Sequence, residues 1–283
     1  MVIGTHEDRS KVERVLERLV GQMREIGGEV IIVASYSHEL PEMPEVRWLS
    51  VPGEKDLVRL RSVGIRAAKG AVVAIGEEHA VPRPDWCRAV LRGHAEHPDA
   101  DAIAGCLVNA TPERVAAHAS FLTFATPFTP PMPALPLDRP PPLSVLSLKR
   151  RALASLGDLP DTLDARLLPQ IFSEGRIAAD DRIIADHFQD FTFAQAVRNQ
   201  FWVNRSSYGH SLAGAGGAER RKVARWILRH LAQQFWREAR AAVPAGRRRR
   251  RELLCVAVFA GAASVGGVCG ALFGPGRSSE RMA

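Results

Sequence analysis

The chain has 283 residues, of which 46% are hydrophobic and 24% are charged. This length suits one large α/β domain with an appendage, and this composition excludes a chain that is disordered throughout. The formal net charge is +7, but residues 219–251 contain 12 Lys and Arg against 2 Asp and Glu, which leaves about −3 on residues 1–218. Because the basic segment borders a hydrophobic run, we expect it to meet a membrane surface and not a nucleic acid.

The first part of the chain alternates between short β-branched runs and helical periodicity. A short apolar stub at Val2-Ile3 opens the chain. The expected strands cover residues 29–34, 46–51, 71–75 and 102–105, and the expected helices cover residues 10–20, 56–69 and 86–94. Gly70 is the expected C-cap of the second helix. This alternation predicts an α/β fold with a mostly parallel sheet and helices on both of its faces.

Three polar side chains follow the strand expected at residues 71–75. They are Glu77, Glu78 and His79. In open α/β sheets, ligands bind beyond the carboxyl ends of the strands. The three residues are therefore candidates for a ligand site, and a solvated acidic loop is the alternative.

A proline-rich stretch covers residues 126–142, and its prolines cannot maintain the hydrogen bonds of a helix or a ladder. We expect a loop over the ligand cleft there. Further on, the pattern predicts a helix over residues 161–175, kinked near Pro169, and two short strands at 176–178 and 182–185.

Residues 219–243 have apolar side chains every four residues and a separate row of arginines. An amphipathic helix of this kind can lie among lipid headgroups. A surface helix packed on the main domain is the alternative.

Residues 253–273 form a run of 21 residues without a charge, just after five arginines at 247–251. That length spans a hydrocarbon core of about 30 Å at about 1.5 Å per residue. We expect a transmembrane or membrane-inserted helix, with a re-entrant or interfacial hairpin as the alternative. Gly266 and Gly270 have the small-xxx-small spacing of close helix packing. The arginines should stay on the cytoplasmic side, which would leave residues 274–283 outside.

Residues 60–70, the apolar strand after them, residues 77–82 and residues 84–86 together resemble the centre of family 2 glycosyltransferases. The order and spacing are those of the family's Gly-Ile helix, apolar strand, acidic triplet and Pro-x-x-Trp turn. Asp164 stands eleven residues before Gly175, and His187 follows a later strand, as in many members. Residues 188–193, 204–208 and 274–276 resemble a bacterial membrane-bound branch of the family.

The resemblance implies the GT-A fold, a Rossmann-like α/β architecture, and inverting transfer of a sugar from a nucleotide-sugar donor. It implies that Asp164 is the catalytic base and that a divalent metal, Mn²⁺ or Mg²⁺, is bound by Glu77, His79 and His187. The nucleotide-sugar contacts that it implies are Thr5, Glu7, Arg61, Glu77 and Glu78. For Arg61, a solvent-facing helix position is the alternative to a phosphate contact.

The expected organisation is a GT-A domain at residues 1–212, a basic juxtamembrane segment at 213–252, the membrane helix at 253–273 and a tail at 274–283. A lipid-linked or envelope glycan acceptor and a place at the bacterial inner membrane, facing the cytoplasm, follow from the same resemblance. The acidic triplet contains no Asp, and Leu163 replaces an acid of the family pattern. The alternative is therefore a degenerate relative that binds nucleotide or partners without turnover.

Overall fold

The computed structural model describes residues 1–5, 9–36, 43–132, 141–154, 171, 176–243, 245–246 and 248–282. The chain divides into two units, which are described separately. Unit 1 comprises Met1–Val108 and Phe128–Phe188, and unit 2 comprises Asn109–Pro127 and Gln189–Ala283.

The described strands of unit 1 form one sheet in the order β3-β2-β1-β4-β7-β6-β8-β5. The strands are β1 (Val2–Thr5), β2 (Val30–Ala34), β3 (Val46–Ser50), β4 (Val72–Gly76), β5 (Ala80–Pro82), β6 (Ala102–Asn109), β7 (Leu146–Lys149) and β8 (Ile177–His187). Strands β3, β2, β1 and β4 pair in parallel, whereas β7 pairs antiparallel with β4 and β6, and β5 pairs antiparallel with β8. The sheet is therefore mixed, with its parallel half at the N-terminal strands.

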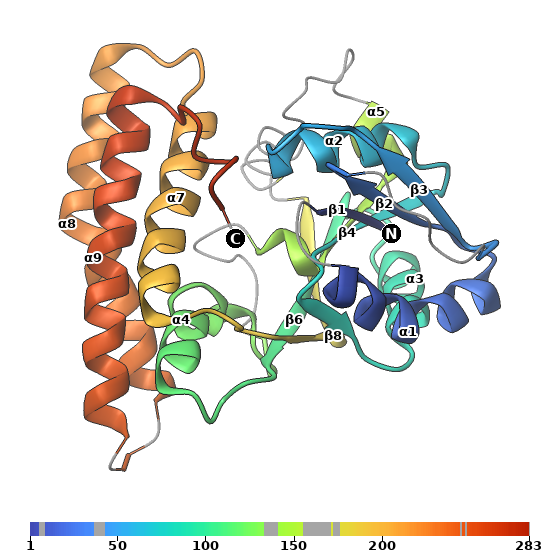
Figure 1. Ribbon diagram of the computed structural model, residues 1–283, viewed down its shortest axis with the longest axis horizontal. Helices are drawn as coiled ribbons and strands as arrows, with labels where there is room; N and C mark the ends of the chain where they lie inside the picture. Colours follow the sequence, from blue (N-terminus) through green and yellow to red (C-terminus); the bar gives the residue numbers. More distant parts are fainter. Residues whose placement is uncertain are drawn as a thin grey trace. The chain divides into compact units, whose positions relative to one another are not determined.

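Helices cover both faces of this sheet, as Figure 1 shows. Helices α1 (Arg9–Ile26) and α3 (Trp86–Glu96) pack on one face, and α2 (Leu57–Ala67) and α5 (Arg150–Ala154) pack on the other. Successive strand residues alternate between the two cores, since Ile3 belongs to the α1 side and Val2 to the α2 side. The predicted α/β class, with helices on both faces of the sheet, is confirmed. The sheet is mixed and not mostly parallel, however, because β7 and β5 each pair antiparallel with their neighbours.

Three details of unit 1 differ from the sequence prediction. Helix α2 is capped at its C-terminus by Ala68 and not by Gly70, because the chain is already extended at Ala68. The two short strands expected at 176–178 and 182–185 are one continuous strand, β8. Of the expected loop at 126–142, residues 126–128 form a 3₁₀ turn, and residues 133–140 lie outside the described part. Of the helix expected at 161–175, all residues but Ile171 lie outside the described part.

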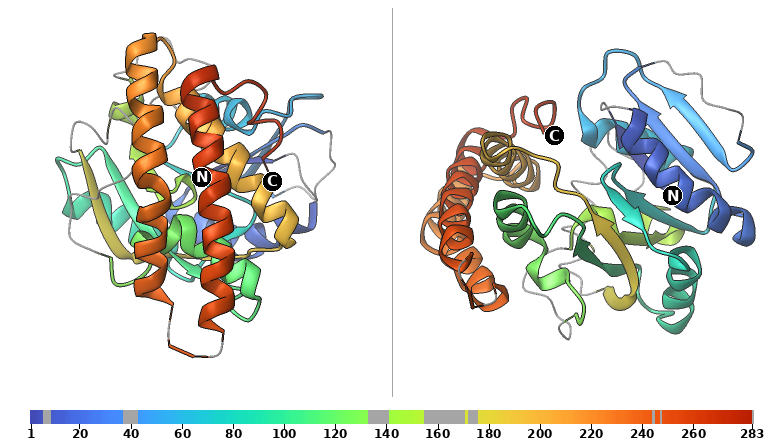
Figure 2. Two further views of the ribbon diagram at one scale, coloured as in Figure 1. Left: turned by 90° about the vertical axis from the view of Figure 1, so that its left-hand side faces the viewer. Right: turned by 60° about the horizontal axis from the view of Figure 1, so that its bottom comes forward.

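Unit 2 is a helical bundle of α4 (Val115–Ala125), α7 (Phe193–Ser211), α8 (Gly217–Ala242) and α9 (Arg249–Phe273). Helix α9 packs against the other three, and α8 and α9 lie side by side in the views of Figures 1 and 2. The division between the units falls after Phe188, because α7 packs along α9. The domain boundary expected at residue 212 stays a prediction. Helix α9 also begins before the uncharged run, so the basic residues 249–251 form its first turn.

Glycines let α7 and α9 approach each other closely. A Cβ atom at Gly266 would overlap the carbonyl oxygen of Phe201, and one at Gly270 would overlap that of Arg205. The predicted small-xxx-small packing is therefore present, and its partner is α7 of the same chain. After α9, Gly274 turns the chain at a φ of 78°, and Pro275 contacts Gly209 of α7. Two motifs far apart in the sequence, 204–208 and 274–276, therefore meet.

Candidate metal and nucleotide site

The site lies where β4 ends. This strand finishes at Gly76, and Glu77, Glu78 and His79 form the short connection to β5. Because β5 pairs antiparallel with β8, Ala80 lies opposite His187, and the amide of Phe188 donates to the carbonyl of His79 at 2.8 Å. This pairing brings His187 beside the connection after β4, although His187 follows His79 by more than a hundred positions in the sequence.

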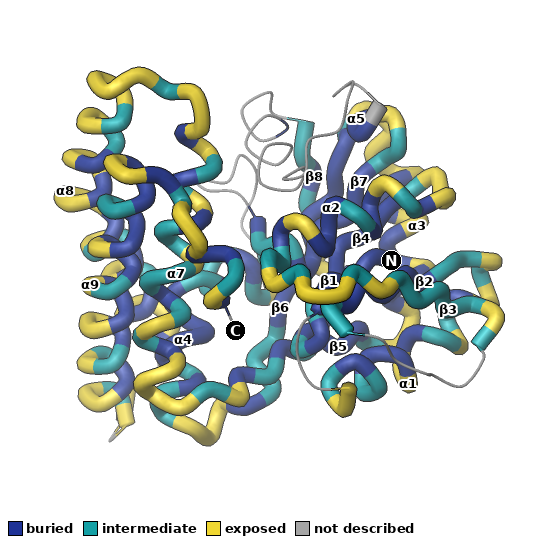
Figure 3. The backbone as a smooth tube through the Cα atoms, turned by 45° about the horizontal axis from the view of Figure 1, so that its top comes forward, coloured by how far each residue is buried: buried dark blue, intermediate teal, exposed yellow. Residues whose placement is uncertain are grey.

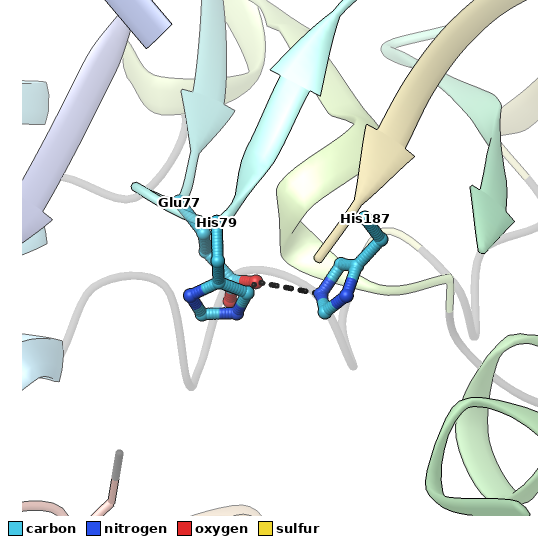
Figure 4. Close-up of side chains that lie close together, drawn as sticks. All are labelled: Glu77, His79 and His187. Atoms are coloured by element: carbon cyan, nitrogen blue, oxygen red, sulfur yellow. Dashed lines mark ion pairs between the residues drawn. The ribbon is translucent and has the colours of Figure 1, made fainter. Parts of the chain in front are cut away.

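Glu77, His79 and His187 form a compact cluster of metal-ligand types (Figure 4). One ligand atom from each lies within 4.8 Å of the others. The Glu77 Oε2 is 3.3 Å from His79 Nε2 and 3.8 Å from His187 Nε2. The two imidazole rings meet edge to face, with their centroids 4.6 Å apart. The carboxylate and the two ring nitrogens therefore converge on one small region.

Arg61 supports the cluster from helix α2. Its Nη1 lies 3.5 Å from Glu77 Oε1, and the residue is buried. Gly4 permits this approach, because a Cβ atom there would lie 2.9 Å from Arg61 Cγ. The alternative of a solvent-facing Arg61 is wrong, since the guanidinium points to the site carboxylate.

The pKa of the Glu77 carboxyl reflects competing effects. Burial acts to raise this pKa, but hydrogen bonds from His187 and His79 and the charges of His79 and Arg61 outweigh it. The pKa lies well below its ordinary value, so Glu77 is a carboxylate at neutral pH. An ionised carboxylate is the form that binds a cation.

A second acidic residue lies deeper in the site. Glu78 is buried, and the hydroxyl of Thr5, at the end of β1, donates to its Oε1 at 3.4 Å. Strands β1 and β4 are parallel neighbours, so both residues lie at the carboxyl edge of the sheet. This edge is where ligands of α/β sheets bind.

The structure thus brings six of the predicted site residues to one edge: Thr5, Arg61, Glu77, Glu78, His79 and His187. Their roles as ligands or nucleotide contacts stay predictions. The other two, Glu7 and Asp164, lie outside the described residues. The sequence did not indicate that Arg61 pairs with Glu77. The pair forms because α2 packs against β1, which places Arg61 beside the end of β4.

The donor set fits a divalent transition metal. Imidazole nitrogen suits Zn²⁺, Cu²⁺, Fe²⁺ or Ni²⁺ and is tolerated by Mn²⁺, whereas Mg²⁺ prefers oxygen ligands and retains water. Two nitrogens and one carboxylate leave other coordination positions open for a ligand. The cluster can therefore hold a metal and present it to a second molecule.

Three further residues near the sheet have structural contacts. Trp86 is a core residue, with 2% of its surface exposed. Lys149 donates to carbonyls after α3, and Arg150 donates to the carbonyls of Ala68 and Gly70 after α2.

No protein-family model and no curated protein matches this sequence. Solved structures do. A mannosyltransferase, PcManGT from Pyrobaculum calidifontis, solved with GDP-Man and Mn²⁺, is 16% identical, with 95% of this chain and 71% of that chain covered and a TM-score of 0.48. S. aureus TarS 1–349 is 10% identical, with 95% and 89% covered and a TM-score of 0.47. A mycobacterial protein is 14% identical over 75% and 72%, at a TM-score of 0.47.

Proposed function

We propose that this chain is a metal-dependent glycosyltransferase that moves a sugar from a nucleotide-sugar donor to a membrane-associated or cell-envelope acceptor. The observation that carries the proposal is the convergence of Glu77, His79 and His187 at the carboxyl edge of the sheet. Its support in the sequence is the family 2 pattern around the same residues. The place of action that follows is the cytoplasmic face of a bacterial inner membrane.

Glu77, His79 and His187 would hold the metal through one carboxylate oxygen and two imidazole nitrogens. A divalent cation there supplies Lewis-acid stabilisation of the charge that develops on a departing nucleotide diphosphate. Arg61 holds the Glu77 carboxylate in place and contributes positive charge beside the same phosphates. Thr5 and Glu78 form the floor of the donor site, where buried acceptor oxygens can take hydrogen bonds from the nucleoside.

Transfer also needs a base for the acceptor hydroxyl, and Asp164 is the residue proposed for this role. It would remove the hydroxyl proton as the acceptor oxygen bonds to the anomeric carbon and the bond to the nucleotide diphosphate breaks. A single displacement of this kind inverts the anomeric centre.

The test is a donor assay on purified full-length protein with UDP-, GDP- and dTDP-sugars, with Mn²⁺ or with EDTA. Hydrolysis and transfer to a lipid extract are measured for the wild type, Glu77→Gln, Asp164→Asn and the control Glu17→Gln, an exposed position on α1. We expect Mn²⁺-dependent donor binding that is lost in Glu77→Gln, and turnover that is lost in Asp164→Asn while binding remains. If no donor binds under any condition, the transferase proposal fails and a degenerate relative becomes the better account.

A further inference from the structure

Helix α9 is apolar on two opposite sides. One side packs in the bundle through residues such as Val256, Phe259 and Ala263. The other side is open, with Leu254, Val258 and Val265 between 47% and 60% exposed. With Gly261 and Leu272, these open positions recur at intervals that keep them on one helix face, the α9 stripe (residues 254, 258, 261, 265 and 272). A stripe of this kind on a helix without a charged residue from 253 to 273 needs an apolar partner.

Among the described residues, α9 is the one helix that is long and apolar enough to cross a membrane, judged by length and composition. Its packing argues against a simple crossing. The glycines of its inner side hold the backbone of α7, and Glu252 is buried beside His118 of α4 and Arg248. A crossing α9 would either carry the polar side chains of α7 into hydrocarbon or give up the close α7 contact, and both are costly.

Helix α7, the packing partner of α9, is too polar for the interior of a membrane. Its polar and ionisable side chains include Arg198, Asn204, Arg205 and His210. Arg205 itself lies at the α9 contact, since its carbonyl faces Gly270 and its Nε donates to the carbonyl of Gly274 at 3.5 Å. An α7–α9 pair with these groups suits the surface of a membrane better than its interior.

The neighbouring helix α8 provides the complementary charge. Its buried side, with Ile227, Leu231 and Phe235, packs in the bundle, and its outer side is basic and aromatic. The exposed basic residues are Arg221, Lys222, Arg225, Arg229, Arg237 and Arg240. Trp226 and Trp236 lie among them and are 45% and 38% exposed. Arginine attracts anionic headgroups, and tryptophan favours the boundary between headgroups and acyl chains.

We propose that the outer sides of α8 and α9 form one membrane-docking surface that lies in the plane of an anionic bilayer leaflet. The α9 stripe enters the boundary of the acyl chains, the α8 arginines meet the headgroups, and the chain does not cross the membrane. Figure 3 shows that both helices keep exposed sides along their length. The proposal rests on the membrane association included in the proposed function, but not on its chemistry, so a failure of one leaves the other intact.

The binding test is flotation of the full chain with vesicles of phosphatidylcholine alone or with about one-third phosphatidylglycerol. We expect strong binding to the anionic vesicles and at least a tenfold loss in the double variant Val258→Glu, Val265→Glu. The control is Leu91→Glu, which changes an exposed leucine of α3 in unit 1 and should bind like the wild type. Arg225→Gln with Arg229→Gln, on the outer side of α8, should lower binding to anionic vesicles only. Circular dichroism verifies that each variant is folded.

The topology test uses Arg277→Cys in a background with Cys255→Ala and Cys269→Ala. Residue 277 is exposed, and the remaining cysteines, Cys87 and Cys106, are buried. With protein added outside the vesicles, we expect a membrane-impermeant maleimide to label this variant fully. Protection of the tail would overturn the proposal in favour of a crossing helix. Failure to bind either vesicle, with stripe-dependent dimers in light scattering, would overturn it in favour of a second copy of the chain.

Discussion

At the scale of single residues, the proposed function depends on three side chains and their chemistry. Glu77 is a carboxylate held by Arg61, and it faces His79 of the β4–β5 connection and His187 at the end of β8. A cation bound here meets more nitrogen than oxygen from the protein. Nitrogen donors favour borderline transition metals over Mg²⁺. Replacing one histidine with an oxygen ligand should therefore change which metal ion the site prefers.

We predict that the wild type binds Mn²⁺ at least about tenfold more tightly than Mg²⁺, and that His79→Asp narrows or reverses this ratio, because the change replaces nitrogen with oxygen. Isothermal titration with each ion measures both affinities. His97→Asp, an exposed histidine after α3, is the matched control and should leave the ratio unchanged. Equal affinity for the two ions in the wild type would contradict the assignment of both histidines as ligands.

At the scale of elements, close contacts at particular glycines decide the packing. Gly266 of α9 has no room for a Cβ beside Phe201 of α7, whereas Gly261 of the same helix has nothing within 4 Å. We predict that Gly266→Ala destabilises the chain by about 1–3 kcal/mol, since the two backbones must separate. Gly261→Ala should stabilise it by about 0.5–1 kcal/mol, because alanine is the better helix former. Denaturant unfolding followed by circular dichroism compares them, and equal effects would rule out the close α7–α9 contact.

A second element-scale prediction concerns α3. His94 is buried, and its Nε2 lies 2.9 Å from the Ser147 hydroxyl of β7. Burial, with the charges of Lys149 and Arg151, lowers its pKa from 6.5 to about 4. Its folded pKa is depressed, so the unfolded chain takes up the proton first, and stability is lost as pH falls from 6.5 to about 4. The loss attributable to His94 is on the order of 3 kcal/mol.

The measurement for this prediction is the free energy of unfolding from pH 7 to pH 4 in the wild type and His94→Gln. The variant cannot titrate there, so its stability should fall less steeply. His230→Gln, at an exposed position on α8, serves as the control for a histidine away from His94. Parallel curves for wild type and His94→Gln would show that this imidazole does not resist protonation.

At the scale of the whole molecule, the sequence predicts most helices and strands of unit 1, but it does not predict how distant elements pack together. β-Branched runs at 30–34 and 72–76 predicted strands, and the Asp56 side chain caps α2 as a helix start should be capped. The cluster of Glu77, His79 and His187 could be anticipated from the family pattern, but its geometry depends on the β5–β8 pairing. Such long-range antiparallel contacts have no local signature.

The organisation of unit 2 shows the same limit. Helix α7 has a local start signal in the sequence, the capping box of Thr192 and Gln195. Helix α4 had none as clear, and its place beside α9 depends on contacts such as His118 with Glu252, which are 134 positions apart. The apolar run 253–273 predicts a membrane helix from its composition, whereas hydropathy does not record that α9 packs against α4, α7 and α8.

The most direct test of the central claim is the effect of nucleotide diphosphate on the electron paramagnetic resonance of bound Mn²⁺. In the wild type, we predict that Mn²⁺ binds, that GDP or UDP changes its spectrum, and that the nucleotide binds at least about tenfold more weakly without the metal. In His187→Asn, bound Mn²⁺ should fall by about 10–100-fold or more, the range for losing even an outer partner of a ligand. Unchanged Mn²⁺ binding in both His187→Asn and Glu77→Gln would contradict the account, because the metal would then lie elsewhere.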